Sequence, residues 1–226
     1  CATLPLAMTL LAGGLAPYAP ALAGVLWWAG VALLLAMQVW GLQRLLAGGI
    51  ELGQVNGGWL MLFVGGIVVP GGGLPLGYEE MSRFAFGVSA AIAPVIMGLA
   101  LLRAVTVPAL PAGLRTSWFI LLMPPALIYA HGSALFPELA FLESLYFLGL
   151  MLALALLAYA RGLARWPFGA PWWAITFPLD ALAYAAARYA GSNPAPVWTV
   201  LCGATLLLAT LAVLLVLTRT ALALRP

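Results

Sequence analysis

Eight apolar stretches, each close to the length that crosses a bilayer, dominate this sequence. They cover approximately residues 2–18, 22–43, 57–74, 84–106, 116–133, 138–160, 171–190 and 197–218. A membrane-spanning helix needs about 20 apolar residues. Only 7% of the 226 residues are charged, whereas soluble domains average about 25%. The sequence therefore predicts an all-α, polytopic membrane protein, with one transmembrane domain over residues 1–226.

Glycine and proline interrupt every second span. The breaks are Pro5 with Gly13 and Gly14, then Gly65, Gly66 and Pro70, then Pro124 and Pro125, and finally Pro178. Broken helices are tolerated in membranes where neighbours or a water-filled cavity satisfy the freed backbone groups. The other four spans are smoother, although the fourth carries Pro94. We expect hairpins that pair one broken inner helix, near a central axis, with one smooth outer helix facing lipid.

Arginine predicts the orientation. All nine basic residues are arginines, and seven follow the even-numbered spans: Arg44, Arg103, Arg115, Arg161, Arg165, Arg219 and Arg225. The positive-inside rule makes their side, with the C-terminus, cytoplasmic, which predicts a multi-pass protein of the plasma or inner membrane. The net charge of +3 then reflects orientation, and no nucleic-acid partner is expected. The first span starts inside, which fits an even number of missing helices and an N-terminally truncated chain.

The seventh span, Trp172 to Tyr189, carries two features that an anchoring helix does not need. Pro178 lies near its middle and frees the carbonyl of Ala174. Asp180 follows two residues later, and a carboxylate near the bilayer midplane costs about 2.5–3.5 kcal/mol on insertion scales. The combination indicates part of a path through the membrane.

Three segments together resemble one family. They are GGWLMLFVGGIVVPGGGLPLGYEEMSRFAFG from Gly57, LPAGLRTSWFILLMPPALIYA from Leu110, and PWWAITFPLDALAYAAARYA from Pro171. In order and spacing they are similar to the tellurite-resistance/dicarboxylate transporter family, which includes the slow-type anion channels of plant guard cells. The resemblance implies ten helices in five hairpins with quasi-fivefold symmetry, a pore within each protomer, and a homotrimer. The eight spans would be helices three to ten, so the first hairpin is absent.

The resemblance also implies a gate, because a phenylalanine on the ninth helix plugs the pore and the matching residue is Phe177. A dry aromatic constriction can gate ion flow, although ordinary helix packing is the alternative. The expected pore-shaping residues are Gly65, Gly66, Pro70, Pro124, Pro125 and Pro178. Pro124 and Pro125 are expected to free the carbonyls of Ile120 and Leu121, as Pro178 frees that of Ala174. Kinks that only serve packing, and glycines that only allow close helix contact, remain alternatives for them.

Asp180 supports two hypotheses. Intramembrane carboxylates usually face the bundle interior and mark ion or proton routes, and burial favours their neutral form. An ionised carboxylate in the pore would repel anions. Asp180 is therefore expected to be protonated, away from the conduction axis, or paired with an arginine. It either couples transport to protons or forms a structural hydrogen bond between helices.

The leading function is passive or proton-linked permeation of small anions. A proton-coupled C4-dicarboxylate or tellurite transporter is the alternative, and a non-transporting accessory subunit is the second. Chloride, nitrate, dicarboxylates, sulfite and tellurite-type anions all stay open. No enzyme, cofactor or metal site is expected, because catalytic sets of facing nucleophiles are missing and His131, expected in an outer loop, is the single histidine. Cys1 and Cys202 form no metal or disulfide pattern, and a lipidated Cys1 is less favoured than truncation.

Overall fold

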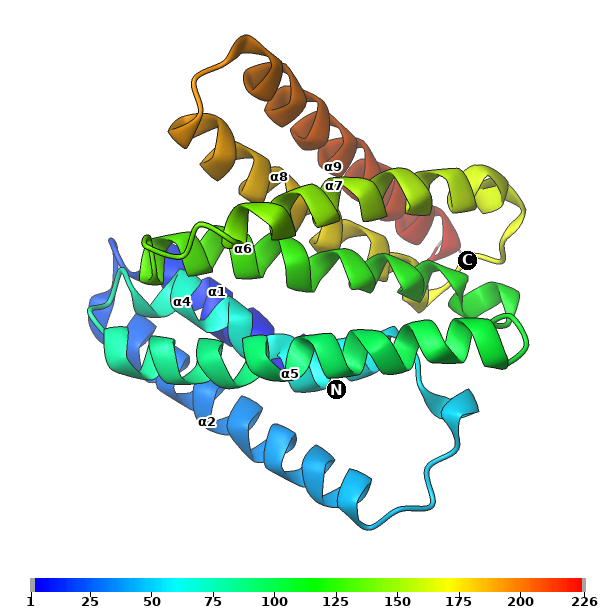
Figure 1. The fold of residues 1–226 in the computed structure, drawn as a ribbon, viewed down its shortest axis with the longest axis horizontal. Helices are drawn as coiled ribbons and strands as arrows, with labels where there is room; N and C mark the ends of the chain where they lie inside the picture. Colours follow the sequence, from blue (N-terminus) through cyan, green and yellow to red (C-terminus); the bar gives the residue numbers. More distant parts are fainter. Residues whose placement is uncertain (1–2, 225–226) are drawn as a thin grey trace. The chain divides into compact units, whose positions relative to one another are not determined.

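The computed structural model describes residues 3–224, so the predictions about Cys1 and Arg225 lie outside the described residues. All regular elements within 3–224 are α- or 3-10 helices, which confirms the all-α prediction. The chain divides between Pro108 and Ala109 into two compact units, coloured blue to green and green to red in Figure 1. The single-domain organisation stays a prediction.

The first unit contains the first four predicted spans. Its elements are α1 (Thr3–Leu15), α2 (Pro20–Leu46), a 3-10 turn (Leu52–Gln54), α3 (Gly57–Val64), a 3-10 segment (Gly65–Val68), α4 (Val69–Gly73) and α5 (Glu79–Thr106). Helix α1 packs against α2 and α4, while α5 packs against α3, the 3-10 segment and α4. Proline at the start of α2 suits a helix N-terminus, where its missing amide hydrogen has no intrahelical partner.

The second unit contains the last four spans. Its elements are a 3-10 segment (Ala112–Leu122), α6 (Met123–Leu135), α7 (Leu142–Tyr159) with a 3-10 extension (Ala160–Arg165), a 3-10 segment (Ala170–Ile175), α8 (Thr176–Ser192) and α9 (Pro196–Ala223). Helix α8 packs against both α6 and α9. The core of the second unit contains apolar side chains from most of these segments, among them Phe119, Leu122, Ala153, Trp172, Ile175, Leu179, Leu182 and Ala209.

Burial separates inner from outer segments. Five segments among the described residues are long and apolar enough to cross a membrane: Pro20–Leu46, Glu79–Thr106, Ala112–Leu135, Leu142–Arg165 and Pro196–Ala223. The most apolar stretch of Ala112–Leu135 is 89% buried, whereas that of Pro196–Ala223 is 22% buried. A large exposed apolar surface marks contact with lipid or with another protein, so the low burial of α9 agrees with its predicted outer position.

The predicted break in the first span is wrong, because α1 runs unbroken from Thr3 to Leu15. Pro5 lies in its first turn, where a missing amide hydrogen removes no intrahelical bond. Gly13 instead marks a close contact, since a Cβ there would lie 2.9 Å from the carbonyl oxygen of Gly71. Proline and glycine in this span therefore serve the start and the packing of a regular helix.

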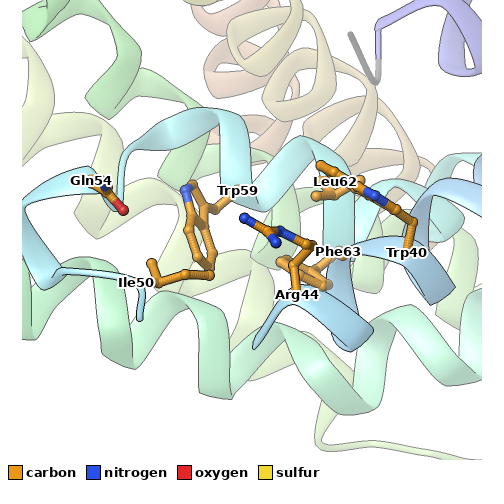
Figure 2. Close-up of a pocket in the computed structure, with 8 residues that line it drawn as sticks. Trp40, Arg44, Ile50, Gln54, Trp59, Leu62 and Phe63 are labelled. Atoms are coloured by element: carbon orange, nitrogen blue, oxygen red, sulfur yellow. The ribbon is translucent and has the colours of Figure 1, made fainter. Parts of the chain in front are cut away.

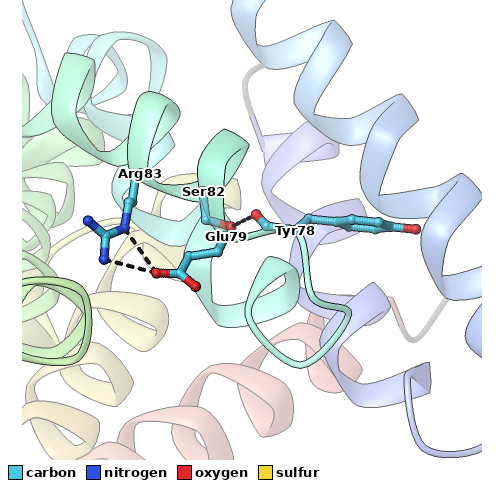
Figure 3. A network of polar contacts seen from close by, with 4 residues as sticks. All are labelled: Tyr78, Glu79, Ser82 and Arg83. Atoms are coloured by element: carbon cyan, nitrogen blue, oxygen red, sulfur yellow. Dashed lines mark hydrogen bonds and ion pairs between the residues drawn. The ribbon is translucent and has the colours of Figure 1, made fainter.

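Helix α5 begins five residues earlier than predicted, at Glu79 (Figure 3). Gly77, with φ of +76°, turns the chain just before it. Glu79 lies in the first turn, where a negative charge complements the helix dipole, and its Oε1 lies 2.9 Å from Nη2 of Arg83. The hydroxyl of buried Ser82 donates to the carbonyl of Tyr78 at 2.7 Å. The charges of Glu79 and Arg83 thus support a helical turn that lies outside the apolar stretch.

Candidate functional site

The three broken spans use one backbone device, a 3-10 segment followed by proline in the first turn of an α-helix. Gly65–Val68 precedes Pro70 of α4, and Ala112–Leu122 precedes the proline pair of α6. Ala170–Ile175 likewise precedes Pro178 of α8. Such stretches of 3-10 helix within a span often mark a hinge or a strained sequence.

The 3-10 geometry can supply a hydrogen-bond donor to a carbonyl that proline leaves unpaired, because proline has no amide hydrogen. In an α-helix, Pro124 would leave the carbonyl of Ile120 without its amide partner. Here the carbonyl of Ile120 accepts instead from the amide of Met123, the residue before Pro124. The prediction that this carbonyl is free is therefore wrong, because the helix tightens before the proline.

The break in the first unit shows the same compensation. The amide of Val69 donates to the carbonyl of Gly66, the group that Pro70 would otherwise leave unpaired. In the third break, the carbonyl of Trp173 accepts from the amide of Thr176 and from its Oγ1 at 2.9 Å. The predicted freeing of the carbonyls of Leu121 and Ala174 stays a prediction.

Polar side chains of the outer helices hold the first unit's break in place. Gln38 of α2 donates through Nε2 to the carbonyl of Phe63 at 3.0 Å and to Oγ of Ser89 at 2.9 Å. The same Ser89 oxygen accepts from the amide of Gly66 at 3.0 Å. All of these groups are buried, so the network replaces hydrogen bonds that water would otherwise make. Sequence reasoning missed Gln38 and Ser89, and the signal was an isolated polar residue in a smooth apolar span.

Replacing Ser89 by alanine is expected to lower the stability of the protein by about 1–3 kcal/mol, because the buried amide of Gly66 loses its acceptor. Thermal unfolding in detergent measures the effect. Ser144→Ala is the control, since the exposed Ser144 hydroxyl bonds only to its own helix start, and a change within about 0.5 kcal/mol is expected. Equal stability of the two variants would show that the network does not support the break.

The predicted pore-shaping residues of this span are all buried. A Cβ on Gly66 would collide with the carbonyl oxygen of Ala85 and with Oγ of Ser89. One on Gly65 would lie 2.9 Å from Cδ2 of Leu6. Both glycines therefore lie where the broken span touches neighbouring helices. Pro124, Pro125 and Pro178 are buried in the second unit.

Phe177 lies on the face of α8 opposite the core of the second unit. Leu179 and Leu182 belong to the buried core, whereas Phe177 is half-buried and neither belongs to that cluster nor packs against it. Successive α-helical residues are rotated by about 100°, so a residue two positions from Leu179 points about 200° away from it. The side chain of Phe177 is thus available to something other than the core.

Asp180 and Tyr184 share this face, because they follow Phe177 by three and seven positions. Both are exposed. Among residues 3–224, Asp180 has no hydrogen bond and no ion pair. The ring of Tyr184 lies 5.5 Å from that of His131, centroid to centroid.

The loop position predicted for His131 is wrong. His131 is buried, at 6% exposure, because α6 continues to Leu135 and Tyr184 lies against the imidazole. No group of three potential metal-binding side chains is found in the described part of the chain. Cys202 is a free, half-buried thiol on α9.

Comparison with known families identifies the chain. A family model described as voltage-dependent anion channel (SLAC1) matches residues 1–221. The chain belongs to this family. It is the family that the three sequence motifs resemble, and its members are channels and transporters of anions in membranes. No curated protein matches the chain. The protein is thus a multi-pass membrane protein of an anion-transporting family.

The arginines of this anion-channel family member differ in environment. Arg44, Arg161 and Arg165 are exposed, as expected for residues that set orientation. Arg115 is half-buried and donates through Nε to the carbonyl of Leu110 at 3.2 Å. Arg103, in the last turn of α5, is only 4% exposed, and its Nε has no hydrogen-bond partner among the described residues. Hydropathy and charge counting did not distinguish Arg103 from the others.

Proposed function

We propose that this protein conducts small anions through a pore bordered by its proline-broken inner helices and closed by Phe177. The observation that carries the proposal is the position of Phe177, next to a helix break and facing away from the core of its unit. An aromatic side chain in such a place can form a dry constriction that gates ions. The family supports anion transport in general.

Gly65, Gly66, Pro70, Pro124, Pro125 and Pro178 are proposed to set the course of the pore-lining segments. The support is the repeated 3-10 to α transition, which redirects each span while keeping its backbone bonded. For the two glycines, their close contacts also support the helix-packing interpretation. We further propose a homotrimer in the plasma or inner membrane with a cytoplasmic C-terminus, on the family resemblance and the arginine distribution.

Flux into proteoliposomes tests the proposed transport. Purified protein is reconstituted, and uptake of chloride, nitrate, a C4-dicarboxylate, sulfite and tellurite is compared with that into protein-free vesicles. We expect selective uptake of at least one of these anions. Uptake no faster than in the empty vesicles, for every anion, would instead favour the non-transporting accessory subunit.

Proton-coupled transport of a dicarboxylate or tellurite is the second candidate. It is favoured by Asp180, which lies one helical turn from Phe177 on the same exposed face and has no partner among the described residues. An ionisable carboxylate beside an anion path can take up a proton with each anion, which removes its repulsion of the anion.

If coupling operates, Asp180→Asn is expected to abolish the pH dependence of flux, because asparagine is neutral at every pH. Flux at two pH values, with and without an imposed proton gradient, measures the effect. Glu138→Gln is the matched control, since Glu138 is an exposed acid in the connection between α6 and α7 and its loss is expected to change nothing. Retention of the full pH dependence by Asp180→Asn would refute coupling through this residue.

A further inference from the structure

A pocket of about 280 Å³ lies within the first unit, where the end of α2 meets α3. Trp40 and Arg44 of α2 and Trp59 and Phe63 of α3 form much of its wall (Figure 2). Gly41 lets the two helices meet here, since a Cβ on it would lie 2.9 Å from Cζ of Phe63. The pocket thus lies beside the close contact between α2 and α3 at Gly41.

The length of α2 places this pocket at the membrane surface. The helix has 27 residues, which at 1.5 Å per residue corresponds to about 40 Å, whereas the hydrocarbon core is about 30 Å thick. Arg44 lies in the last turn, and this end of the helix therefore reaches the headgroup layer. Trp40 and Trp59 are residues of the kind that prefers this layer.

The pocket carries one positive charge and no negative charge to balance it. Arg44 is the charged residue among those that line it, and it forms no ion pair or hydrogen bond within residues 3–224. Figure 2 shows its guanidinium reaching between Trp59 and the Trp40–Leu62 side of the pocket. The start of α3 supplies no free donor at Gly58, whose amide already donates to Oδ1 of Asn56 at 2.9 Å. The recognition element is therefore the guanidinium, whose paired donors match phosphate oxygens.

We propose that this pocket binds the headgroup of an anionic phospholipid. Arg44 holds the phosphate diester, while the rings of Trp40 and Trp59 and the side chain of Leu62 pack against the glycerol and the upper acyl carbons. Large apolar walls around a single cation suit an amphipathic ligand, since a small inorganic anion would leave those walls unused. Basic pockets between helices at the membrane surface are a known type of lipid site. The inference does not depend on transport.

Native mass spectrometry of the delipidated, full chain in detergent tests the site. The protein is titrated with phosphatidylglycerol, with phosphatidylcholine and with inorganic phosphate. Phosphatidylglycerol is expected to bind more tightly than phosphatidylcholine, and Arg44→Gln is expected to weaken its binding about tenfold, which corresponds to about 1.4 kcal/mol. Arg44→Lys is expected to lose less, because it keeps the charge without the paired donors. Arg161→Gln, which removes an exposed arginine from the second unit, is expected to bind as the unaltered protein does.

Two results would overturn the proposal. One is equal affinity of phosphatidylglycerol for the unaltered protein and for Arg44→Gln. The other is displacement of the lipid by inorganic phosphate as readily as by a short-chain phosphatidylglycerol, which would assign the pocket to a free anion. Thermal unfolding shows whether Arg44→Gln is folded. If it is not, the lipid affinity of Arg44→Lys is compared with that of the unaltered protein instead.

Discussion

Phe177→Ala is expected to raise anion current by about tenfold, the change that a barrier lowered by about 1.4 kcal/mol produces. The substitution removes a ring that faces away from the core of the second unit, so little packing is lost. It also widens the proposed constriction beside the break at Pro178 and weakens its exclusion of water. Whole-cell currents in oocytes, normalised to surface expression, measure the effect.

Phe168→Ala is the matched control. Phe168 is also half-buried and lies in the same unit, but it packs against the hydrophobic core and against Trp172, with ring centroids 5.3 Å apart. Its loss is expected to lower stability without raising current. An unchanged current in well-expressed Phe177→Ala would contradict the gate, and an equal rise in both variants would show a general loosening of the unit.

Gly66→Ala is expected to lower the stability of the protein by about 1–3 kcal/mol, the usual effect of overpacking a well-packed contact. Its added methyl group would collide with the carbonyl of Ala85, which belongs to the backbone of α5 and cannot rotate away. It also collides with Oγ of Ser89, which accepts the bond from the amide of Gly66. The thermal midpoint of unfolding in detergent measures the change.

Two other glycines provide the comparison for Gly66. Gly98 of α5 has open space where a Cβ would be placed, so Gly98→Ala is expected to be neutral or to stabilise by up to about 1 kcal/mol through helix propensity. Gly65→Ala meets the end of the Leu6 side chain, which can move, and its effect is expected to lie between the other two. A Gly66→Ala protein as stable as Gly98→Ala would show that α5 does not depend on this close approach.

The spans were predictable because hydropathy alone decides which segments can enter a bilayer. All eight predicted stretches correspond to helical segments, and three of the four predicted breaks occur at their glycines and prolines. The family also followed from the sequence, since its motifs keep their order and spacing. The break predicted in the first span, at Pro5, was wrong because proline in the first turn of a helix removes no intrahelical hydrogen bond.

The details of the breaks were not predictable because they depend on contacts between distant residues. The bond from Gln38 to Phe63 joins positions 25 apart, and that from Gln38 to Ser89 joins positions 51 apart. His131 was misplaced for the same reason, since Tyr184 covers it from another helix. Burial of Arg103 is likewise a tertiary property.

The reversal potential of the Phe177→Ala current tests the central claim most directly. The variant is reconstituted into a planar bilayer under a tenfold gradient of the potassium salt of the best-transported monovalent anion. A Phe177-gated anion pore predicts a reversal close to the equilibrium potential of that anion, about 59 mV from zero for one charge. A reversal near the potassium potential, of opposite sign, or no current above that of a protein-free bilayer, would contradict the account.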